Sequence, residues 1–158
     1  MAWTKTSTSL IAKNRLMTFH EVVANDSDKT LVFNSDVGVG EFLHILSVRA
    51  TLATSGTAGN RRVTLELIDA DAVVVLRVEA TTVVPATTTE IYNFQTGLAG
   101  TQQGLGGLVS TEEYDTLTDH FYLGKGMSMR IYDSAAVDAA ADDLTVHILG
   151  QVHSPETK

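Results

Sequence analysis

Several aspartates near the C-terminal end are the side chains of this sequence best suited by type to bind a metal ion. Asp133, Asp138, Asp142 and Asp143 lie in one alanine-rich segment, and carboxylate oxygens are the ligands that calcium and magnesium prefer. The segment lacks the D-x-[DN]-x-[DN]-G spacing of the standard calcium loop, and aspartate is also a preferred capping and turn residue. We expect these side chains to satisfy local backbone groups and to hold no metal; a divalent-cation site is the alternative.

The histidines and the other paired aspartates have no metal-ligand spacing. His44 and His147 fall in segments with strand periodicity, where a hydrogen-bonded or interface histidine is the common case. Asp69 and Asp71 flank the tip of an expected hairpin, where aspartate usually accepts hydrogen bonds from its own backbone. None of the histidines forms an H-x-x-x-H pair, since they stand at positions 20, 44, 120, 147 and 153.

No segment has the spacing of a known catalytic motif. The nearest match to a nucleophile elbow, Gly126-Met-Ser128-Met-Arg130, has arginine where a second glycine is needed, and no helix is expected after it. The glycine-rich stretch 97–107 lacks both the G-x-x-x-x-G-K-[ST] pattern and a helix to receive a phosphate. Two carboxylates brought together by folding would leave no local signature, so a hydrolase of that kind stays open. We expect no enzyme and no cofactor.

Composition and charge narrow the class of protein. The 158 residues suffice for one domain, and the absence of cysteine excludes disulfides and thiolate metal sites. Nineteen acidic against eleven basic residues give a formal net charge of −8, which argues against nucleic-acid binding. The adjacent Arg61 and Arg62 would point to opposite faces of a strand, so we expect a solubilising pair.

Neither a membrane span nor a secretory signal is evident in the sequence. No apolar run approaches the ~18–20 residues that a membrane-spanning helix needs. The N-terminal residues lack the apolar region of a signal peptide. We therefore expect a protein that is soluble as made, in the cytoplasm, and that has no membrane partner.

Periodicity predicts short β-strands along most of the chain. The turn residues at 69–71 predict a hairpin between two of them, and we expect a second hairpin between the last two. Ser110 with Glu113 has the spacing of a capping box for one helical turn, and the glycines of 97–107 predict a long loop. The expected strands, in which apolar and polar side chains mostly alternate, lie within 16–23, 31–33, 41–54, 63–67, 74–78, 83–84, 90–95, 127–132 and 144–148.

These strands predict an all-β protein built as a single β-sandwich. We prefer a jelly-roll-like arrangement, in which long crossing loops close two four-stranded sheets. Residues 1–15 are rich in Thr and Ser and lack periodicity, so we expect them to form an extended N-terminal arm. Residues 16–158 would then form the sandwich domain.

The start of the longest expected strand is a candidate interface. Phe42, Leu43 and Ile45 make it apolar on both sides, because Leu43 and Ile45 are expected to face away from Val48. A loop, the arm or a neighbouring subunit would have to cover such a strand.

The N-terminal arm is the second candidate for a contact between molecules. It contains the chain's one tryptophan, Trp3, together with the cations Lys5, Lys13 and Arg15 and no acidic residue. An aromatic anchor among cations is suited to docking on an acidic partner. A disordered tail is the alternative.

The C-terminal part resembles a known class of proteins. From Leu123 the pattern is Leu-Gly-x-Gly-x-Ser-x-Arg-x-Tyr-Asp-Ser-Ala-Ala-Val-Asp, and Ala-Asp-Asp-Leu-Thr-Val follows, ending at Val146. This pattern resembles the C-terminal hairpin of small β-sandwich structural proteins of tailed bacteriophages. The resemblance extends from about Leu43 onward and is sharpest from Leu123 to Val146, whereas the N-terminal third has no such pattern.

Within that class the sequence is most like a capsid decoration, or cement, protein. The resemblance implies a homo-oligomer, typically a trimer, that binds the outer surface of the phage major capsid protein shell and stabilises it. It also implies synthesis in the host cytoplasm and a final place on the exterior of the virion. The alternatives are a tail, neck or fibre-associated structural protein and a carbohydrate- or receptor-binding β-sandwich module.

Overall fold

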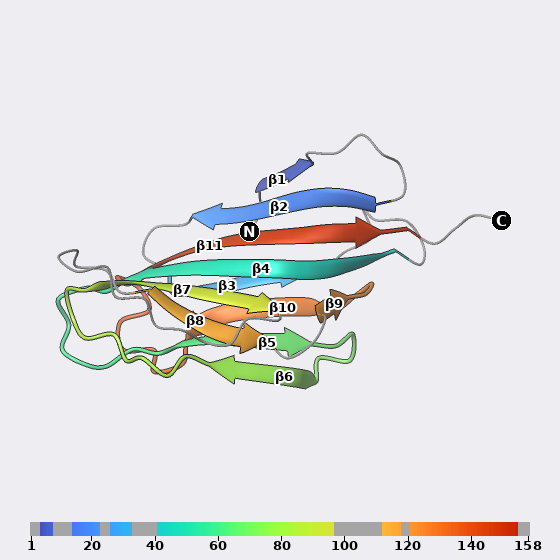
Figure 1. Ribbon diagram of the computed structural model, residues 1–158. Helices are drawn as coiled ribbons and strands as arrows, with labels where there is room; N and C mark the ends of the chain where they lie inside the picture. Colours follow the sequence, from blue (N-terminus) through green and yellow to red (C-terminus); the bar gives the residue numbers. More distant parts are fainter. Residues whose placement is uncertain are drawn as a thin grey trace.

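The chain folds into two β-sheets that enclose a common core, as the computed structural model shows (Figure 1). The structure describes residues 4–7, 14–22, 26–32, 41–96, 112–117 and 121–154. Every regular element in these ranges is a β-strand. The ranges accordingly contain no helix that is long and apolar enough to cross a membrane. The predicted all-β sandwich is confirmed.

Within the described residues the larger sheet has seven strands and the smaller sheet has four. The order in the larger sheet is β1 (Thr4–Ser7), β2 (Asn14–Val22), β11 (Asp143–His153), β4 (Phe42–Ala53), β7 (Thr89–Thr96) and β8 (Glu112–Leu117), and β9 (Phe121–Leu123) also pairs with β4. The order in the smaller sheet is β3 (Asp28–Val32), β10 (Ser128–Asp133), β5 (Val63–Ile68) and β6 (Val74–Glu79). Among the described pairs only β7 and β8 run parallel.

The core lies between the sheets because the strand period of two sends alternate side chains to one face. In β11 every second residue from Leu144 to Val152 is buried. In β10 the buried positions include Met129 and Ile131, which belong to the same core cluster as the buried residues of β11. Leu65 of β5 completes the same cluster. Burying each such aliphatic side chain stabilises the fold by roughly 1.5–3 kcal/mol.

β10 and β11 belong to different sheets, so the predicted C-terminal hairpin is wrong. β10 pairs with β3 and β5, whereas β11 pairs with β2 and β4. Both strands alternate as expected, but residues 134–142 carry the chain across the sandwich and do not fold it back within one sheet. The jelly-roll arrangement is not confirmed, because the sheets differ from the expected two of four strands.

The other local predictions have mixed outcomes. The hairpin of β5 and β6 is confirmed. Val84 forms only an isolated bridge with Arg61, in keeping with the predicted end of a strand. The helical turn expected from the capping box is wrong, because Glu113 lies in β8 and pairs with Tyr92 of β7. The predicted loop 97–107 lies outside the described residues.

A β-bulge interrupts the pairing of β4 with β11. Ser47 is opposite Leu149 and Ile45 is opposite Gly150, so Leu46 has no partner in β11. The neighbour on the other side of β4 changes at the same place, from β9 to β7. One extra residue in a strand shifts the alternation of every residue beyond it.

The bulge moves the start of β4 into the core. Leu43 and Ile45 are 0% and 1% exposed, and both share the buried face with Val48. The prediction that they face away from Val48 is therefore wrong, because counting by twos does not detect an inserted residue. Phe42 stays on the outside, at 38% exposed.

Part of the predicted arm is incorporated in the larger sheet. β1 pairs with β2 from Thr4 opposite His20 to Ser7 opposite Met17. Arg15 lies in β2, opposite Val152. A contact role for residues 1–15 stays a prediction, and β1 would make it through the backbone edge of a sheet.

Gly150 allows β4 and β11 to approach closely beside the bulge, which gives a testable prediction. A Cβ at this position would lie 2.7 Å from Cδ1 of Leu43 and 3.0 Å from the carbonyl oxygen of His44. We expect Gly150→Ala to lower the free energy of unfolding by about 1–3 kcal/mol, the usual range for overpacking. Gly56→Ala is the control, because nothing lies within 4 Å of a Cβ there, and it should change stability by less than about 1 kcal/mol. Equal urea midpoints for the two variants would contradict this role of Gly150.

Candidate functional site

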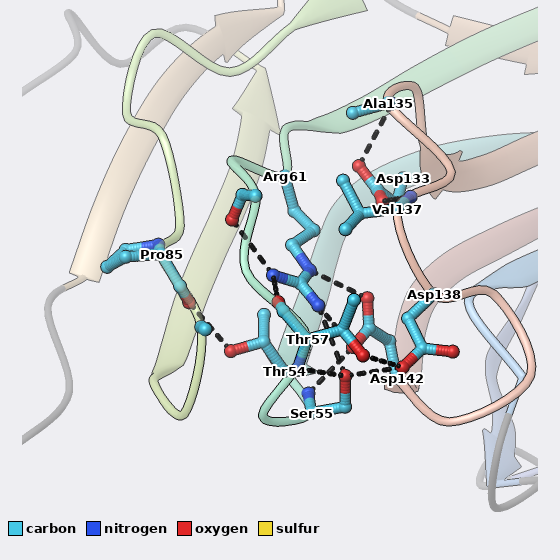
Figure 2. Close-up of polar contacts among 12 residues, drawn as sticks. Thr54, Ser55, Thr57, Arg61, Pro85, Asp133, Ala135, Val137, Asp138 and Asp142 are labelled. Carbon is cyan, nitrogen blue, oxygen red and sulfur yellow. Dashed lines mark hydrogen bonds and ion pairs between the residues drawn. The ribbon is translucent and has the colours of Figure 1, made fainter.

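The segment with the candidate metal ligands lies where the chain crosses between the sheets, and its carboxylates bind the protein's own donors (Figure 2). We call Ser55, Thr57, Arg61, Asp138 and Asp142 the Arg61 cluster. Arg61 and Asp142 are both fully buried. Nε of Arg61 donates to Oδ2 of Asp142 at 2.9 Å, and Nη2 donates to Oδ1 at 3.2 Å. This two-point geometry is the strongest that an arginine and a carboxylate form.

The remaining donors of Arg61 are also used. Nη1 donates to the carbonyl oxygens of Thr57 and Gly59, at 2.7 and 2.9 Å. Nη2 also donates to Oγ of Ser55 at 3.2 Å. A guanidinium has five N–H groups in a fixed plane, and each one here has an acceptor. The expectation of a solubilising arginine pair is wrong for Arg61.

The carboxylates of the cluster hold the loop between β4 and β5. The backbone N–H of Ser55 donates to Asp142 at 2.7 Å. The hydroxyls of Ser55 and Thr57 donate to Oδ2 of Asp138 at 2.7 and 2.6 Å. The hydrogen bonds from Thr57 and Ser55 stabilise the ionised carboxyl, and they lower the pKa of Asp138.

Two further aspartates accept hydrogen bonds from backbone N–H groups. Asp133 accepts from the N–H groups of Arg62 and Ala135, at 2.9 and 3.1 Å. Asp69 accepts from Asp71 and Val73 at the tip of the β5–β6 hairpin, as expected. Within the described residues no group of three or more His, Asp or Glu is arranged to hold a metal ion.

The outer face of the smaller sheet carries charged side chains that pair with one another. Nε of Arg130 donates to Asp28 at 2.9 Å, and the guanidinium lies 4.1 Å from the ring centre of Tyr132. The hydroxyl of Tyr132 donates to Glu66 at 2.8 Å, and burial, together with this hydrogen bond, raises its pKa. Of the segment compared above with a nucleophile elbow, Ser128 to Arg130 lie in strand β10, and its arginine is held by an aspartate.

The outer face of the larger sheet carries a cluster of rings, which we call the aromatic patch: Phe42, His44, Tyr122 and His153. Phe42 lies against His153 with ring centres 5.0 Å apart and against Tyr122 at 5.2 Å. The rings of His44 and Tyr122 are 4.8 Å apart. The rings come from β4, β9 and β11. Beyond the bulge Phe42 lies opposite His153 of β11, and His44 lies opposite Tyr122 of β9.

The aromatic patch combines exposed apolar rings with an unmet polar atom. Phe42 and Tyr122 are 38% and 43% exposed, and both are among the large hydrophobic side chains that the fold leaves at the surface. Nε2 of His153 is buried and has no hydrogen-bond partner among the described residues. Exposed aromatic rings are typical of protein interaction sites. The patch is the candidate functional site.

A second pair of histidines lies on the same face of the larger sheet. The rings of His20 in β2 and His147 in β11 stack with centres 4.0 Å apart, since these residues are directly opposite in the ladder. Arg49 is opposite His147 on the other side. Burial, and then the positive charges of His20 and Arg49, lower the pKa of His147 below its usual 6.5.

The residues predicted as an interface have different places in the fold. Phe42 belongs to the aromatic patch, whereas Leu43 and Ile45 are in the core. Lys5 and Arg15 lie in β1 and β2. Trp3 and Lys13 lie outside the described residues. Tyr122 and His153 were not predicted from the sequence, because β9 and β11 meet β4 only in the folded chain, and no local spacing indicates that meeting.

Comparison with known proteins assigns no family to the chain. No protein-family model and no curated protein sequence matches it. A crystal structure of the agarase AgWH50C is similar over 99% of this chain and 22% of that chain, with 7% identity and a TM-score of 0.29. A structure of infectious bursal disease virus Gx strain is similar over 92% of this chain and 43% of that chain, with 11% identity and a TM-score of 0.30. A structure of T=1 particles derived from infectious bursal virus is similar over 92% of this chain and 41% of that chain, with 10% identity and a TM-score of 0.33. The chain spans less than half of each of these structures, and similarity at this level identifies no function.

The Arg61 cluster predicts a large difference between two carboxylate-to-amide changes. Asp142→Asn leaves the buried Arg61 without its counter-charge and should lower the free energy of unfolding by about 3–5 kcal/mol. Glu79→Gln breaks the ion pair of Glu79 with Arg62, in which both side chains are more than one-third exposed, and should cost less than about 1 kcal/mol. Urea unfolding with unchanged m values would measure both. A loss of less than about 1 kcal/mol for Asp142→Asn would show that the buried pair does not hold the sheets together.

The His20–His147 pair predicts a loss of stability in mild acid. Because the pKa of His147 is lower in the folded chain, the unfolded chain binds this proton more readily, and stability falls as the pH drops below about 6.5. Nuclear magnetic resonance should place the imidazole titration of His147 below pH 6.5. His147→Gln should reduce the stability lost between about pH 7.5 and 5.5, whereas Thr145→Gln on the same strand should not. An imidazole midpoint at or above 6.5 would contradict the prediction.

Proposed function

We propose that this chain is a virion structural protein, and within that class a capsid decoration protein of a tailed phage. The observation that carries the proposal is the aromatic patch, a group of rings with Phe42 and Tyr122 exposed, on one face of a sandwich whose described elements are all strands. A rigid β-scaffold with an aromatic surface cluster is suited to binding another protein, since aromatic side chains are enriched at the centre of interfaces. The partner would be the outer surface of the major capsid protein shell.

The contrast between the two outer faces supports placing the contact on the larger sheet. On the smaller sheet Arg130, Glu66 and Tyr132 already bind one another, and replacing such bonds by intermolecular ones gains little. On the larger sheet Phe42 and Tyr122 expose apolar rings that gain by burial. The aromatic patch would therefore face the shell.

The sequence resemblance supports the class of protein. Its quoted pattern covers β10, the crossing segment and the start of β11, so it includes Asp133, Asp138 and Asp142. In this chain Asp138 and Asp142 bind donors of the loop between β4 and β5, at the crossing between the sheets. A homotrimer on the virion exterior is the assembly that the resemblance implies.

The geometry of the patch disfavours the sugar-binding alternative. The rings of Phe42 and Tyr122 meet edge to face, at 83°. A sugar ring stacks on a flat aromatic platform, which these two rings do not form. The tail, neck or fibre alternative uses the same kind of protein contact and differs in location and copy number.

Electron cryo-microscopy of phage particles assembled with the chain present tests the location. We expect density for the sandwich at many symmetry-related positions on the outside of the head, with the larger sheet toward the shell. A few copies at one vertex or along the tail would favour the alternative structural role. A particle without the chain would overturn the proposal.

A matched pair of tyrosine variants tests the aromatic patch. Tyr122→Ser should weaken attachment to capsids that lack the chain by about tenfold or more, the usual effect of truncating an aromatic anchor. Tyr132→Ser removes the same ring from the outer face of the smaller sheet and should leave attachment within about threefold of the unaltered protein. Co-sedimentation measures both, with circular dichroism as the check on folding. Equal attachment of the two variants would place the contact elsewhere.

A further inference from the structure

A row of basic side chains crosses the outer face of the larger sheet. His20 of β2 is directly opposite His147 of β11, which in turn is directly opposite Arg49 of β4. We call these three residues the basic row. His147 and Arg49 are exposed, and His20 is half-buried. Three adjacent strands thus place basic groups side by side on the surface of a chain whose formal net charge is −8.

The charges that act on His147 are all positive. Burial and then the charges of His20 and Arg49 lower its pKa, and no carboxylate of the described residues offsets them. A negative charge brought to this place from outside would therefore meet attraction from each member of the row.

The other groups on this face are either uncharged or distant from His147. Along β11 the nearest titratable side chains on the same face are Asp143 and His153, four and six positions away. At roughly 3.3 Å per residue these separations are about 13 and 20 Å, beyond the screening length of about 8 Å at physiological salt. The uncharged neighbours of the row on the adjacent strands are Thr4 of β1, Thr18 of β2, Ser47 and Thr51 of β4 and Asn93 of β7.

The geometry of the row suits a carboxylate better than a metal ion. The rings of His20 and His147 are stacked, with centres 4.0 Å apart and planes within 14° of parallel. Imidazole lone pairs lie in the ring plane, so two stacked rings do not converge on one metal ion, and the charge of Arg49 opposes a cation. Neighbouring N–H groups of parallel rings can instead serve the two oxygens of one carboxylate.

The surroundings of the row favour a protein as the source of that carboxylate. His147 and His153 are six positions apart in β11, so the row lies roughly 20 Å from the aromatic patch on the same face. A protein interface of standard size covers about 800 Å² on each partner, which is roughly 30 Å across. One partner can therefore cover both. The net charge of −8 disfavours a nucleic acid.

We propose that the basic row binds a carboxylate of a partner protein. Naming the capsid shell as that partner rests on the proposed function, whereas the site itself does not. The bound carboxylate favours protonated His147, so the complex takes up a proton that the free chain lacks. Binding should therefore strengthen as the pH falls from 7.5 to 5.5.

Nuclear magnetic resonance of the isolated chain tests the site, with a tetraglutamate peptide as the probe at constant ionic strength. We expect saturable changes in the imidazole signals of His20 and His147, and a rise of about 0.5–1 in the titration midpoint of His147. The peptide should then bind about three- to tenfold more tightly at pH 5.5 than at pH 7.5. An unchanged midpoint for His147 would overturn the proposal. A short duplex DNA that shifts these signals at lower concentration than the peptide would also overturn it.

Charge variants separate the row from the general field of the protein. Arg49→Gln and His147→Gln should each weaken peptide binding by about threefold or more. Lys125→Gln removes an exposed cation from the turn before β10 and should leave binding within about twofold. Arg49→Gln should also raise the midpoint of His147 in the free chain, because a charge that lowers its pKa is gone. Equal effects of Arg49→Gln and Lys125→Gln would overturn the site.

Capsid attachment at two pH values tests the shell as the partner. Attachment of the unaltered chain should be stronger at pH 6 than at pH 7.5, and His147→Gln should remove this dependence. Tyr122→Ser should weaken attachment at both values. Attachment that needs Tyr122 but is indifferent to pH and to His147 would overturn the contact between the row and the shell and leave the aromatic patch in place. If the unaltered chain does not attach at all, the proposed function fails, and the peptide experiment still decides the site.

Discussion

Burial of the Arg61 guanidinium is the constraint on which the rest of this structure depends. A buried charge is tolerated only with a paired counter-charge and a full set of hydrogen bonds. Here the counter-charge is Asp142, 81 residues further along the chain. Because Asp142 immediately precedes β11, the pair fixes where the chain enters the larger sheet after leaving the smaller one. Ser55 and Thr57 connect the end of β4 to the same point. One ion pair thus ties the two sheets together at one end of the sandwich.

The two outer faces of the sandwich differ in how far their charged and apolar side chains are paired or covered. On the outer face of the smaller sheet, described charged side chains such as Arg130 and Asp28 pair with one another. The larger sheet carries the exposed rings of Phe42 and Tyr122 and, in His153, a nitrogen without a hydrogen-bond partner among the described residues. His147, which stacks on His20 on that face, has a pKa lowered by burial and by the nearby charges of His20 and Arg49.

Strand alternation is a local property, and it made most of the fold predictable from the sequence. β2, β4, β5, β6, β7, β10 and β11 fall close to their expected ranges. The sheet to which each strand belongs depends on pairing between segments that are distant in the sequence. The prediction of a C-terminal hairpin was wrong for this reason. The inserted Leu46 is invisible to counting by twos, and it moved Leu43 and Ile45 from a candidate interface to the core. The burial of Arg61 could not be predicted either, because no residue near it in the sequence indicates the distant aspartate that permits its burial.

The position of β11 has a consequence for the order of events during folding. β11 is the last described strand in the sequence, yet it lies between β2 and β4 near the middle of the larger sheet. On the ribosome, β2 and β4 have no common neighbour until residues 143–153 have emerged. The larger sheet therefore cannot form strand by strand from the N-terminus. One edge of β2 and one edge of β4 stay unpaired until β11 has been synthesised. Folding should therefore be slow, because closure joins segments far apart in the chain, and nascent chains that stop short of β11 should aggregate.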